Sequence, residues 1–254
     1  MKPQIGLIGI IQDELKKDFW GTLKKVSGMG YRGLESPWGF EQSGLSREEF
    51  RKRLDDLGLK IPLLGTSAES LEKSYGAEVA KFRAMACDKA VIYWSTCASK
   101  EEVLGDTARF AGLGKRLRQD GIRLCYHNHD HEFLNVYDGK SAMELIVENS
   151  DPADLSIELD VGWAMMGKVD PAEWIRRLKG RCPVLHLKDF YDLNDRKSFT
   201  ELGTGLNDFK KIFKAAEESG VEWGIVEQDT MRSLSSMDSI AKSIGNLRSQ
   251  GLVG

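Results

Sequence analysis

Cysteine and histidine are scarce in this 254-residue chain, which contains four of each. The cysteines are Cys87, Cys97, Cys125 and Cys182. No two of them form a C-x-x-C pair, so the sequence lacks both the usual thiolate zinc motif and a dithiol redox motif. We therefore expect four reduced thiols that serve mainly as packing residues.

Long apolar runs and an excess of positive charge are also missing. No apolar stretch approaches the roughly 20 residues that span a bilayer. The apolar start "MKPQIGLIGIIQDELKK" continues as an acidic, amphipathic segment where a signal peptide would need a cleavage site. The net charge is −3, and scattered Lys and Arg give no electrostatic reason to expect nucleic acid or an anionic membrane as a partner. We expect a cytoplasmic protein.

The chain does contain a regular alternation of short aliphatic runs with amphipathic segments. Hydrophobic residues make up 41% of it, enough for a large core. Eight runs have the composition of strands. They are residues 4–10, 32–35, 60–65, 90–94, 122–129, 155–160, 183–189 and 223–229.

Helix signals occupy the segments between these runs. Four helix starts carry capping signals: Ser46-x-x-Glu49, Ser99-x-x-Glu102, Ser141-x-x-Glu144 and Asp170-Pro171. Four glycines stand where helices are expected to end: Gly30, Gly58, Gly121 and Gly220. Short connections of this kind predict parallel strands, because a crossover helix joins parallel neighbours economically.

Two architectures fit eight such units. An open doubly wound sheet would need a G-x-G-x-x-G loop after the first strand, and "GLIGIIQDELKKDF" has none. Eight units can instead close into a barrel. We predict an α/β fold, a single (β/α)8 TIM barrel that forms one domain over residues 1–254.

Three of the four histidines lie in "CYHNHDHEF", residues 125–133. Alternate residues of a strand share a face, so His127 and His129 are expected to point the same way. His127 is a candidate metal ligand and His129 a candidate acid, base or substrate donor. We expect neither role for His131, which falls in the following loop.

Polar residues also end other predicted strands, and in such a barrel the carboxyl ends of the strands carry the active site. They are Glu35, Glu158, Asp160, His186, Lys188, Glu227 and Asp229. An acid at a strand end is usually a helix N-cap, but we expect another role for Asp160, because the next helix signal comes only at Pro171. A core histidine is the ordinary alternative for His186. Asp160 and Glu227 on neighbouring strands favour a metal site instead.

Carboxylates with one or two imidazoles suit Mn²⁺, Mg²⁺, Co²⁺ or Zn²⁺, and no thiolate selects zinc. Lys188 lies two residues after His186 and should share its face. One bound divalent metal would act as a Lewis acid on a carbonyl or hydroxyl group.

The motifs "GYRGLE", "VIYW", "YHNHDHEF", "IELDVGW", "VLHLKDF" and "VEWGIVEQD" together resemble the xylose-isomerase-like sugar isomerase/epimerase barrels. That family includes ketose 3-epimerases, inosose dehydratase and, more distantly, endonuclease IV. The resemblance extends over essentially the whole chain. It implies one metal held by residues from the fifth to eighth strands, here His127, Asp160, His186 and Glu227, with Glu227 also moving a proton.

The sequence departs from the family pattern at several positions. His127 stands where the epimerases have a metal-binding Glu that also abstracts a proton, and an imidazole bound to metal replaces that carboxylate poorly. Trp163 stands where they have a substrate-binding His. Lys188 occupies the stretch in which they have a substrate-clamping Arg. Glu132 matches a further substrate-binding Glu.

These features lead to one main hypothesis and two others. The first is an enzyme that removes a proton beside the carbonyl of a sugar or keto-sugar, through an enediolate, with Glu227 as base and Lys188 or His129 as acid. The outcome is isomerisation, epimerisation, dehydration or glycoside elimination. The others are a non-catalytic sugar-binding barrel and a phosphodiesterase like endonuclease IV, which needs more histidines and a basic groove.

Aromatic and glycine residues near the predicted mouth complete the expectations. Trp38, Trp94 and Trp163 can stack on sugar faces or simply pack the barrel. Glu35, Trp94, Glu132 and Trp163 are the predicted substrate-binding residues. Gly203-Thr204-Gly205 lacks a helix directly behind it, so we do not predict a phosphate-binding loop there. Outer helices of such a barrel can support a homo-oligomer.

Overall fold

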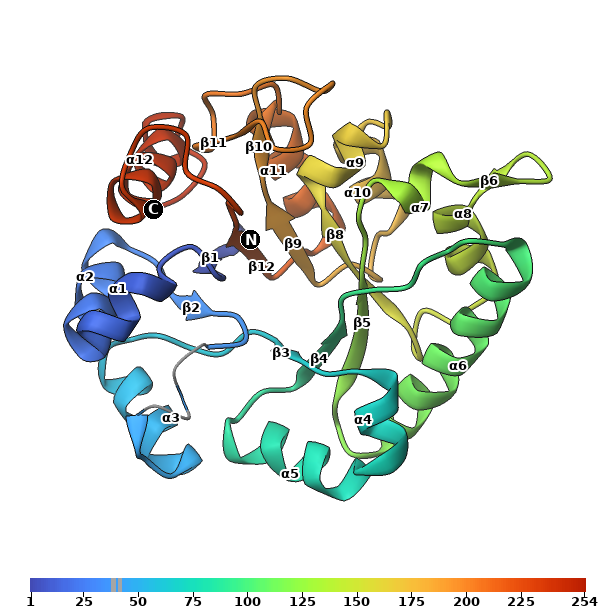
Figure 1. Ribbon diagram of the computed structural model, residues 1–254, viewed down its shortest axis with the longest axis horizontal. Helices are drawn as coiled ribbons and strands as arrows, with labels where there is room; N and C mark the ends of the chain where they lie inside the picture. The colour runs from blue at the N-terminus through green and yellow to red at the C-terminus, as the bar shows by residue number, and fades with distance from the viewer. Residues whose placement is uncertain (38–39, 41–42) are drawn as a thin grey trace.

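The computed structural model describes residues 1–37, 40 and 43–254. Eight parallel strands surround the centre of the molecule, in the order β2-β1-β12-β9-β8-β5-β4-β3. They are β1 (Gln4–Leu7), β2 (Gly33–Leu34), β3 (Leu64–Gly65), β4 (Lys89–Ile92), β5 (Arg123–His127), β8 (Ser156–Asp160), β9 (Val184–Leu187) and β12 (Trp223–Val226). Figure 1 shows these strands in the middle and the helices around them.

The barrel closes between β2 and the chain that leads into β3. Gly33 forms a parallel bridge with Lys60. The Leu34 amide donates to the Lys60 carbonyl (2.8 Å) and the Ser36 amide to the Leu63 carbonyl (3.1 Å). These bonds join the two ends of the strand order, so the predicted (β/α)8 TIM barrel is confirmed.

The strands end earlier than the sequence predicts. The fifth ends at His127, the seventh at Leu187 and the eighth at Val226, whereas the predicted runs extend to 129, 189 and 229. After β9 the chain leaves the parallel sheet, because β10 (Asp189–Phe190) pairs antiparallel with β11 (Phe199–Thr200). A second small hairpin joins β6 (Val136–Tyr137) to β7 (Lys140–Ser141).

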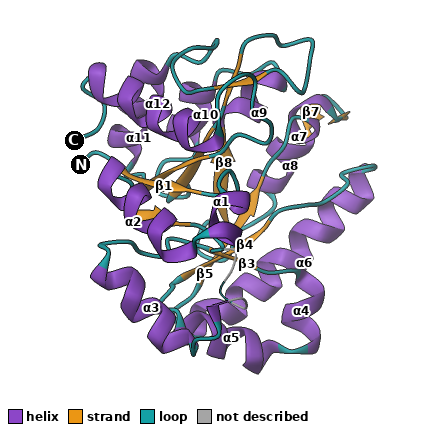
Figure 2. Cartoon of the chain, turned by 60° about the vertical axis from the view of Figure 1, so that its left-hand side comes forward, coloured by secondary structure: helices purple, strands orange, loops and turns teal. Residues whose placement is uncertain are grey.

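Helices surround the barrel, as Figure 2 shows from a second direction. They are α1 (Gln12–Lys17), α2 (Phe19–Met29), α3 (Arg47–Asp56), α4 (Ala68–Lys73), α5 (Tyr75–Ala84), α6 (Lys100–Gln119), α7 (His131–Leu134), α8 (Ala142–Glu148), α9 (Val161–Met166), α10 (Pro171–Arg177), α11 (Phe209–Ser219) and α12 (Ser236–Ser249). Among the described residues, no helix is both long and apolar enough to cross a membrane.

Most of the predicted helix signals are confirmed. Ser46 and Ser141 form complete capping boxes, and Asp170 caps α10 with proline at its first position. Ser99 accepts a bond from the Glu102 amide, but its box is incomplete because the Glu102 carboxylate binds Thr96 and Ala98 instead. Gly30 and Gly220 end their helices in the left-handed conformation, which glycine adopts without steric cost.

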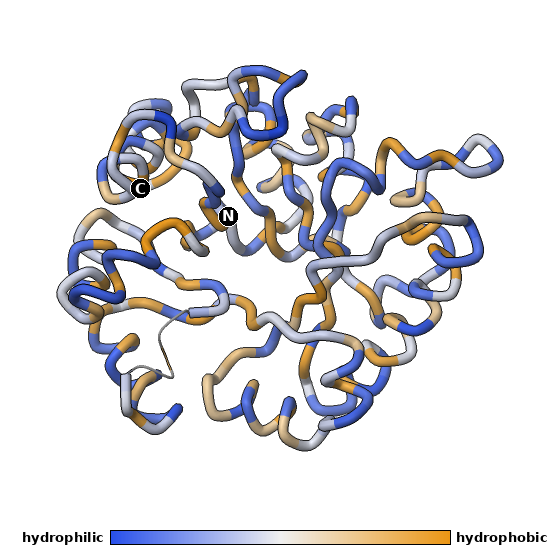
Figure 3. The backbone as a smooth tube through the Cα atoms, in the orientation of Figure 1, coloured by the Kyte–Doolittle hydropathy of each residue, from blue (hydrophilic) through white to orange (hydrophobic). Residues whose placement is uncertain are grey.

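Hydrophobic residues follow the strands and alternate with hydrophilic ones along the helices (Figure 3). Most of the core lies between strands and helices. A smaller buried cluster comes from Leu63, Val91, Cys125, Val184, Trp223 and Ile225. All four cysteines are buried and free, as predicted.

Candidate active site

Strand alternation places the polar residues directly above this smaller apolar cluster. Residues two apart on a strand share a face, so four of the six cluster residues are followed by a polar residue on the same side. The pairs are Val91 with Tyr93, Cys125 with His127, Val184 with His186 and Ile225 with Glu227. Parallel pairing sets Asp160 beside His186 and Glu158 beside His127. The mouth of the barrel is therefore a layer of ionisable groups on an apolar floor.

His186 lies at the centre of this layer and is only 1% exposed. Its Nδ1 is 2.9 Å from Glu227 Oε2, and its Nε2 is 3.1 Å from Glu35 Oε2 and 3.2 Å from Glu158 Oε1. Burial alone would lower the pKa of His186, but the acidic side chains of Glu158, Glu35 and Glu227 outweigh burial and raise that pKa well above its usual value. The ring is therefore an imidazolium in this arrangement.

His127 has the opposite protonation state. Its Nδ1 is 3.1 Å from Glu158 Oε2, and its ring lies 4.5 Å from that of His186. Burial, followed by the positive charge of His186, holds the pKa of His127 well below its usual value. Burial and the nearby Glu35 raise the pKa of Glu158 to about 8, so Glu158 carries the proton at neutral pH.

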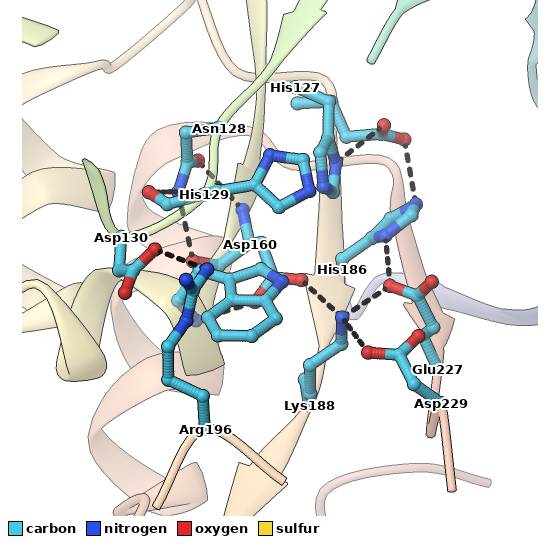
Figure 4. A network of polar contacts seen from close by, with 12 residues as sticks. His127, Asn128, His129, Asp130, Asp160, His186, Lys188, Arg196, Glu227 and Asp229 are labelled. Atoms are coloured by element: carbon cyan, nitrogen blue, oxygen red, sulfur yellow. Dashed lines mark hydrogen bonds and ion pairs between the residues drawn. The ribbon is translucent and has the colours of Figure 1, made fainter. Parts of the chain in front are cut away.

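Lys188 is surrounded by carboxylates, as Figure 4 shows. Its Nζ is 2.9 Å from Glu227, 3.2 Å from Asp229 and 3.4 Å from Asp160, and it lies 4.8 Å from the Trp163 ring. Burial alone would raise the pKa of Glu227, but Lys188 and His186 outweigh it and hold that pKa well below its usual value. Glu227 is an ionised carboxylate between two cations.

Asp160 corrects one expectation from the sequence. It does cap a helix, because α9 begins at Val161 and the Trp163 amide donates to Asp160 Oδ1 (2.8 Å). This short helix has no separate start signal in the sequence, because its cap is the last residue of the strand itself. The other oxygen, Oδ2, is buried without a hydrogen-bond partner among the described residues, and burial raises the pKa of Asp160 to about 6.

His129 lies beyond the end of β5 yet still faces the site. Its ring is 5.0 Å from that of His127 and 4.8 Å from that of Trp94. Its amide donates to Glu132 Oε2 (2.8 Å), and Glu132 also accepts from the Tyr126 hydroxyl. Burial and then Lys188 lower the pKa of His129 to about 3. Glu132 is fully buried and holds the loop that presents His129.

The remaining predicted residues have varied surroundings. Glu35 is buried and accepts a bond from the Tyr93 hydroxyl (2.7 Å), while Trp94 is 54% exposed and Trp163 is buried. Trp38 falls outside the described residues. His131 Nε2 donates to the Ser95 carbonyl oxygen (2.8 Å). Together with Cys97 and Glu132, His131 forms a separate group of possible metal-ligand atoms.

Sequence reasoning assigned no role to Glu158, Tyr93 or Arg196. Glu158 is among the polar residues at the predicted strand ends, and its position two residues before Asp160 on one strand is the signal that it shares the face of the site. Tyr93 directly follows β4, in which Lys89 is followed by three apolar residues, so no polar pattern on that strand pointed to the site. Arg196 belongs to the loop between β10 and β11, where its guanidinium binds Asp130 (2.9 Å) and lies 5.1 Å from the Trp163 ring.

A cavity of about 740 Å³ opens over these groups, a size typical of sites for small molecules. His127, His129, His186 and Glu227 line it, together with Tyr93 and Asp229. Residues of the β1–α1 segment form another part of its wall. The predicted metal and catalytic residues therefore converge on one cavity or on side chains bonded to its wall.

The donor set fits a divalent cation. Two overlapping groups have their ligand atoms within 4.8 Å of one another: His127, Glu158 and His186, and Asp160, His186 and Glu227. Among the described residues, Glu158 Oε1 and Asp160 Oδ2 are buried and accept no hydrogen bond, although each lies near one cation, His186 Nε2 (3.2 Å) and Lys188 Nζ (3.4 Å) respectively. If ionised, the site's carboxylates outnumber its cations, and uncompensated buried charge is costly. A cation held by oxygen and imidazole ligands would relieve this excess.

Comparisons with known proteins agree with this fold. Residues 107–250 match the family described as xylose isomerase-like TIM barrel. An inosose dehydratase of Lacticaseibacillus casei is 29% identical over 133 residues, which are 46% of this chain and 44% of that protein. The match thus spans less than half the length of that relative.

Two solved structures have the same fold along their whole length. A sugar phosphate isomerase/epimerase from Parabacteroides distasonis has a TM-score of 0.84 at 24% identity, covering 100% of this chain and 96% of the other. The IOLI protein with a binding zinc atom has a TM-score of 0.76 at 14% identity, covering 100% and 98%. The family match covers more than half of this chain, and the alignments with both solved structures cover all of it. This protein therefore belongs to the xylose isomerase-like TIM barrel family.

Proposed function

We propose that this protein removes a proton beside the carbonyl of a sugar or keto-sugar, through an enediolate, with the help of a divalent metal. The observation that carries the proposal is the position of Glu227. Its Oε2 is 2.9 Å from both His186 Nδ1 and Lys188 Nζ, at the wall of the cavity. An ionised base beside fixed positive charge is what enolisation requires, because negative charge develops on the carbonyl oxygen.

His127, Asp160, His186 and Glu227 would hold the metal, and Glu158 lies within reach of two of them. When bound, a divalent metal supplies Lewis-acid polarisation of a substrate carbonyl or hydroxyl. The zinc in the IOLI protein supports this assignment. Mn²⁺, Mg²⁺ and Co²⁺ suit the same donors, since none is a thiolate.

The enediolate left when Glu227 takes the proton has two fates. Return of a proton to the adjacent carbon gives isomerisation, and return to the same carbon on the opposite face gives epimerisation, with His129 or Lys188 donating to oxygen. Loss of a β-oxygen group that Lys188 or His129 protonates gives dehydration or glycoside elimination. Lys188 favours the second outcome, because its ammonium contacts the Glu227 carboxylate, so base and acid lie on one side of the substrate, as syn elimination requires. The inosose dehydratase relative points the same way.

The experiment is solvent exchange. Metal-loaded protein is incubated in D₂O with a panel of ketoses, keto-glycosides and inososes, and NMR follows deuterium at the carbon beside the carbonyl. We expect exchange with at least one compound, accompanied by elimination if Lys188 acts as the acid. A panel without any exchange would contradict the enediolate and favour a binding protein.

Two buried lysines allow the isomerase and dehydratase outcomes to be separated. Lys188→Met should lower elimination about 10²- to 10⁴-fold while deuterium exchange persists. Lys89 is also buried, bonded to Asp88 and Glu222 at the start of β4, far along the strand direction from the mouth. Lys89→Met therefore controls for the loss of a buried lysine and should keep both reactions. Equal loss of exchange and elimination in Lys188→Met would contradict a specific acid role.

A further inference from the structure

The charged groups around the cavity bear on the substrate as well as on the reaction. We infer, resting on the proposed function, that the substrate is an uncharged polyhydroxylated carbonyl compound and that the site excludes phosphate esters and carboxylates. Among the residues that the structure describes, the groups that would bind a phosphate are missing from the cavity wall or already bonded within the protein. Proteins bind phosphate with free Arg or Lys side chains, or with free backbone amides.

The wall of the cavity is acidic. Asp13, Glu14 and Asp229 line it, and no Lys or Arg lines it in the part of the chain that the structure describes. Glu14 Oε2 is buried there and meets no hydrogen-bond donor among the described residues. Such an oxygen can accept a hydrogen bond from a sugar hydroxyl. A phosphate group in the position of that hydroxyl would instead bring its negative charge next to the Glu14 carboxylate.

The nearby cations are already engaged. Lys188 contacts Asp160, Glu227 and Asp229, and only 2% of its side chain is exposed. Arg196 binds Asp130 and lies on the Trp163 ring. His186, the cation that lines the cavity, is likewise paired with Glu227, Glu35 and Glu158. A phosphate would therefore have to break a buried ion pair before it met one of these positively charged side chains.

The glycine-rich loop after β11 is also occupied. Asp189 Oδ2 accepts from the amides of Gly203 (3.0 Å) and Gly205 (2.9 Å), and Oδ1 accepts from the amide of Asn207 (3.0 Å). This is the arrangement by which backbone amides cradle an anion, and a side chain of the protein itself fills it. Asp189 is 1% exposed, so the cradle is not available to a ligand.

Paired substrates test the inference. Deuterium exchange is measured at low salt with D-fructose and D-fructose 6-phosphate, with D-tagatose and D-tagatose 6-phosphate, and with an inosose. We expect kcat/KM for the neutral compound to exceed that for its phosphate by at least about tenfold. Glu14→Lys should narrow this ratio. Glu217→Lys makes the same charge change on the exposed side of α11 and should leave the ratio as it is.

A higher kcat/KM for the phosphate esters would overturn this inference and leave the proposed function standing. Titration calorimetry with inorganic phosphate and with fructose 6-phosphate decides the matter without catalysis. We expect no binding by the wild type, and a Kd below about 1 mM for either probe would overturn the inference even if no compound exchanged. Absence of exchange with every compound would contradict the proposed function alone.

Discussion

The protonation of single residues at the barrel mouth follows from their immediate neighbours. Glu158 is buried and Glu227 is partly buried at the cavity wall. Burial and Glu35 raise the pKa of Glu158 to about 8, while Lys188 and His186 lower that of Glu227. Two carboxyl groups of one site thus differ in charge at neutral pH, a pattern found where one of them acts as a base.

Replacement of Glu227 by Gln should lower the rate of deuterium exchange about 10²- to 10⁴-fold, because the ionised base is lost. Glu222 precedes the same strand, β12, at its other end and binds Lys89 (2.8 Å). Glu222→Gln is thus a matched control that should exchange like the wild type. Rates within a few-fold of wild type for Glu227→Gln would assign the base elsewhere.

The metal proposal is tested on three residues. Protein purified without added metal should contain one equivalent of Zn, Mn, Co or Mg by elemental analysis, and Asp160→Ala and His127→Ala should lose it. His131→Ala removes a histidine of the same motif that bonds to the Ser95 carbonyl and should retain the metal. If the wild type neither contains nor takes up metal, the assignment of His127 as a ligand is wrong.

At the scale of secondary-structure elements, the loops at the mouth are held by carboxylates that bind backbone amides. Asp160 caps α9, Glu132 holds the loop after β5, and Asp189 joins β10 to the Gly203–Asn207 loop. Each bond satisfies a backbone amide that is outside the regular hydrogen bonds of helices and strands, so these acids fix the shape of the loops around the site.

Asp189→Ala should lower the free energy of unfolding by at least about 3 kcal/mol, because it leaves several buried amides without an acceptor. Added phosphate or sulfate should restore part of this loss by entering the vacated cradle, which urea denaturation in chloride and in sulfate can measure. Asp195→Ala removes an exposed acid that accepts from one amide, that of Lys197, and should change stability little. An Asp189→Ala protein as stable as the wild type would contradict the argument.

At the scale of the whole molecule, the buried acids couple stability to pH. The pKa of Glu158 is about 8 in the folded chain, against an ordinary glutamate value of 4.5, so the folded state holds more protons than the unfolded state between these pH values. The free energy of unfolding therefore falls as pH rises through this range. The raised pKa of His186 also makes the free energy of unfolding fall as pH rises above 6.5. The lowered pKa values of His127 and His129 make the free energy of unfolding rise with pH, but only below pH 6.5.

Metal-free protein should accordingly lose stability between about pH 6.5 and 8, by at most about 1.4 kcal/mol per pH unit for one proton. Urea denaturation in a chelator measures the slope, and Glu158→Gln should reduce it. A bound metal at 100 times its Kd should add about 2.7 kcal/mol. A stability that rises with pH in this window would contradict the protonation assigned to Glu158.

Much of this protein was determined by its sequence alone. Eight aliphatic runs, their caps and their glycine stops predicted the barrel, and alternate spacing predicted that His186 and Lys188 share a face. These features depend on residues close together in the chain, where periodicity and local hydrogen bonding act directly. The ends of the strands and the short helix α9 were not predicted, because Asp160 belongs to both a strand and a cap.

Only the tertiary structure decided which groups meet. Glu35 reaches His186 across 151 residues of chain, and Asp189 accepts hydrogen bonds from the amides of the Gly203–Gly205 loop. The pKa values of Glu158 and Glu227 diverge because closure of the barrel buries them beside different charges. Such contacts depend on the order of the strands and on how far side chains extend into a shared interior. Local sequence patterns determine neither of these.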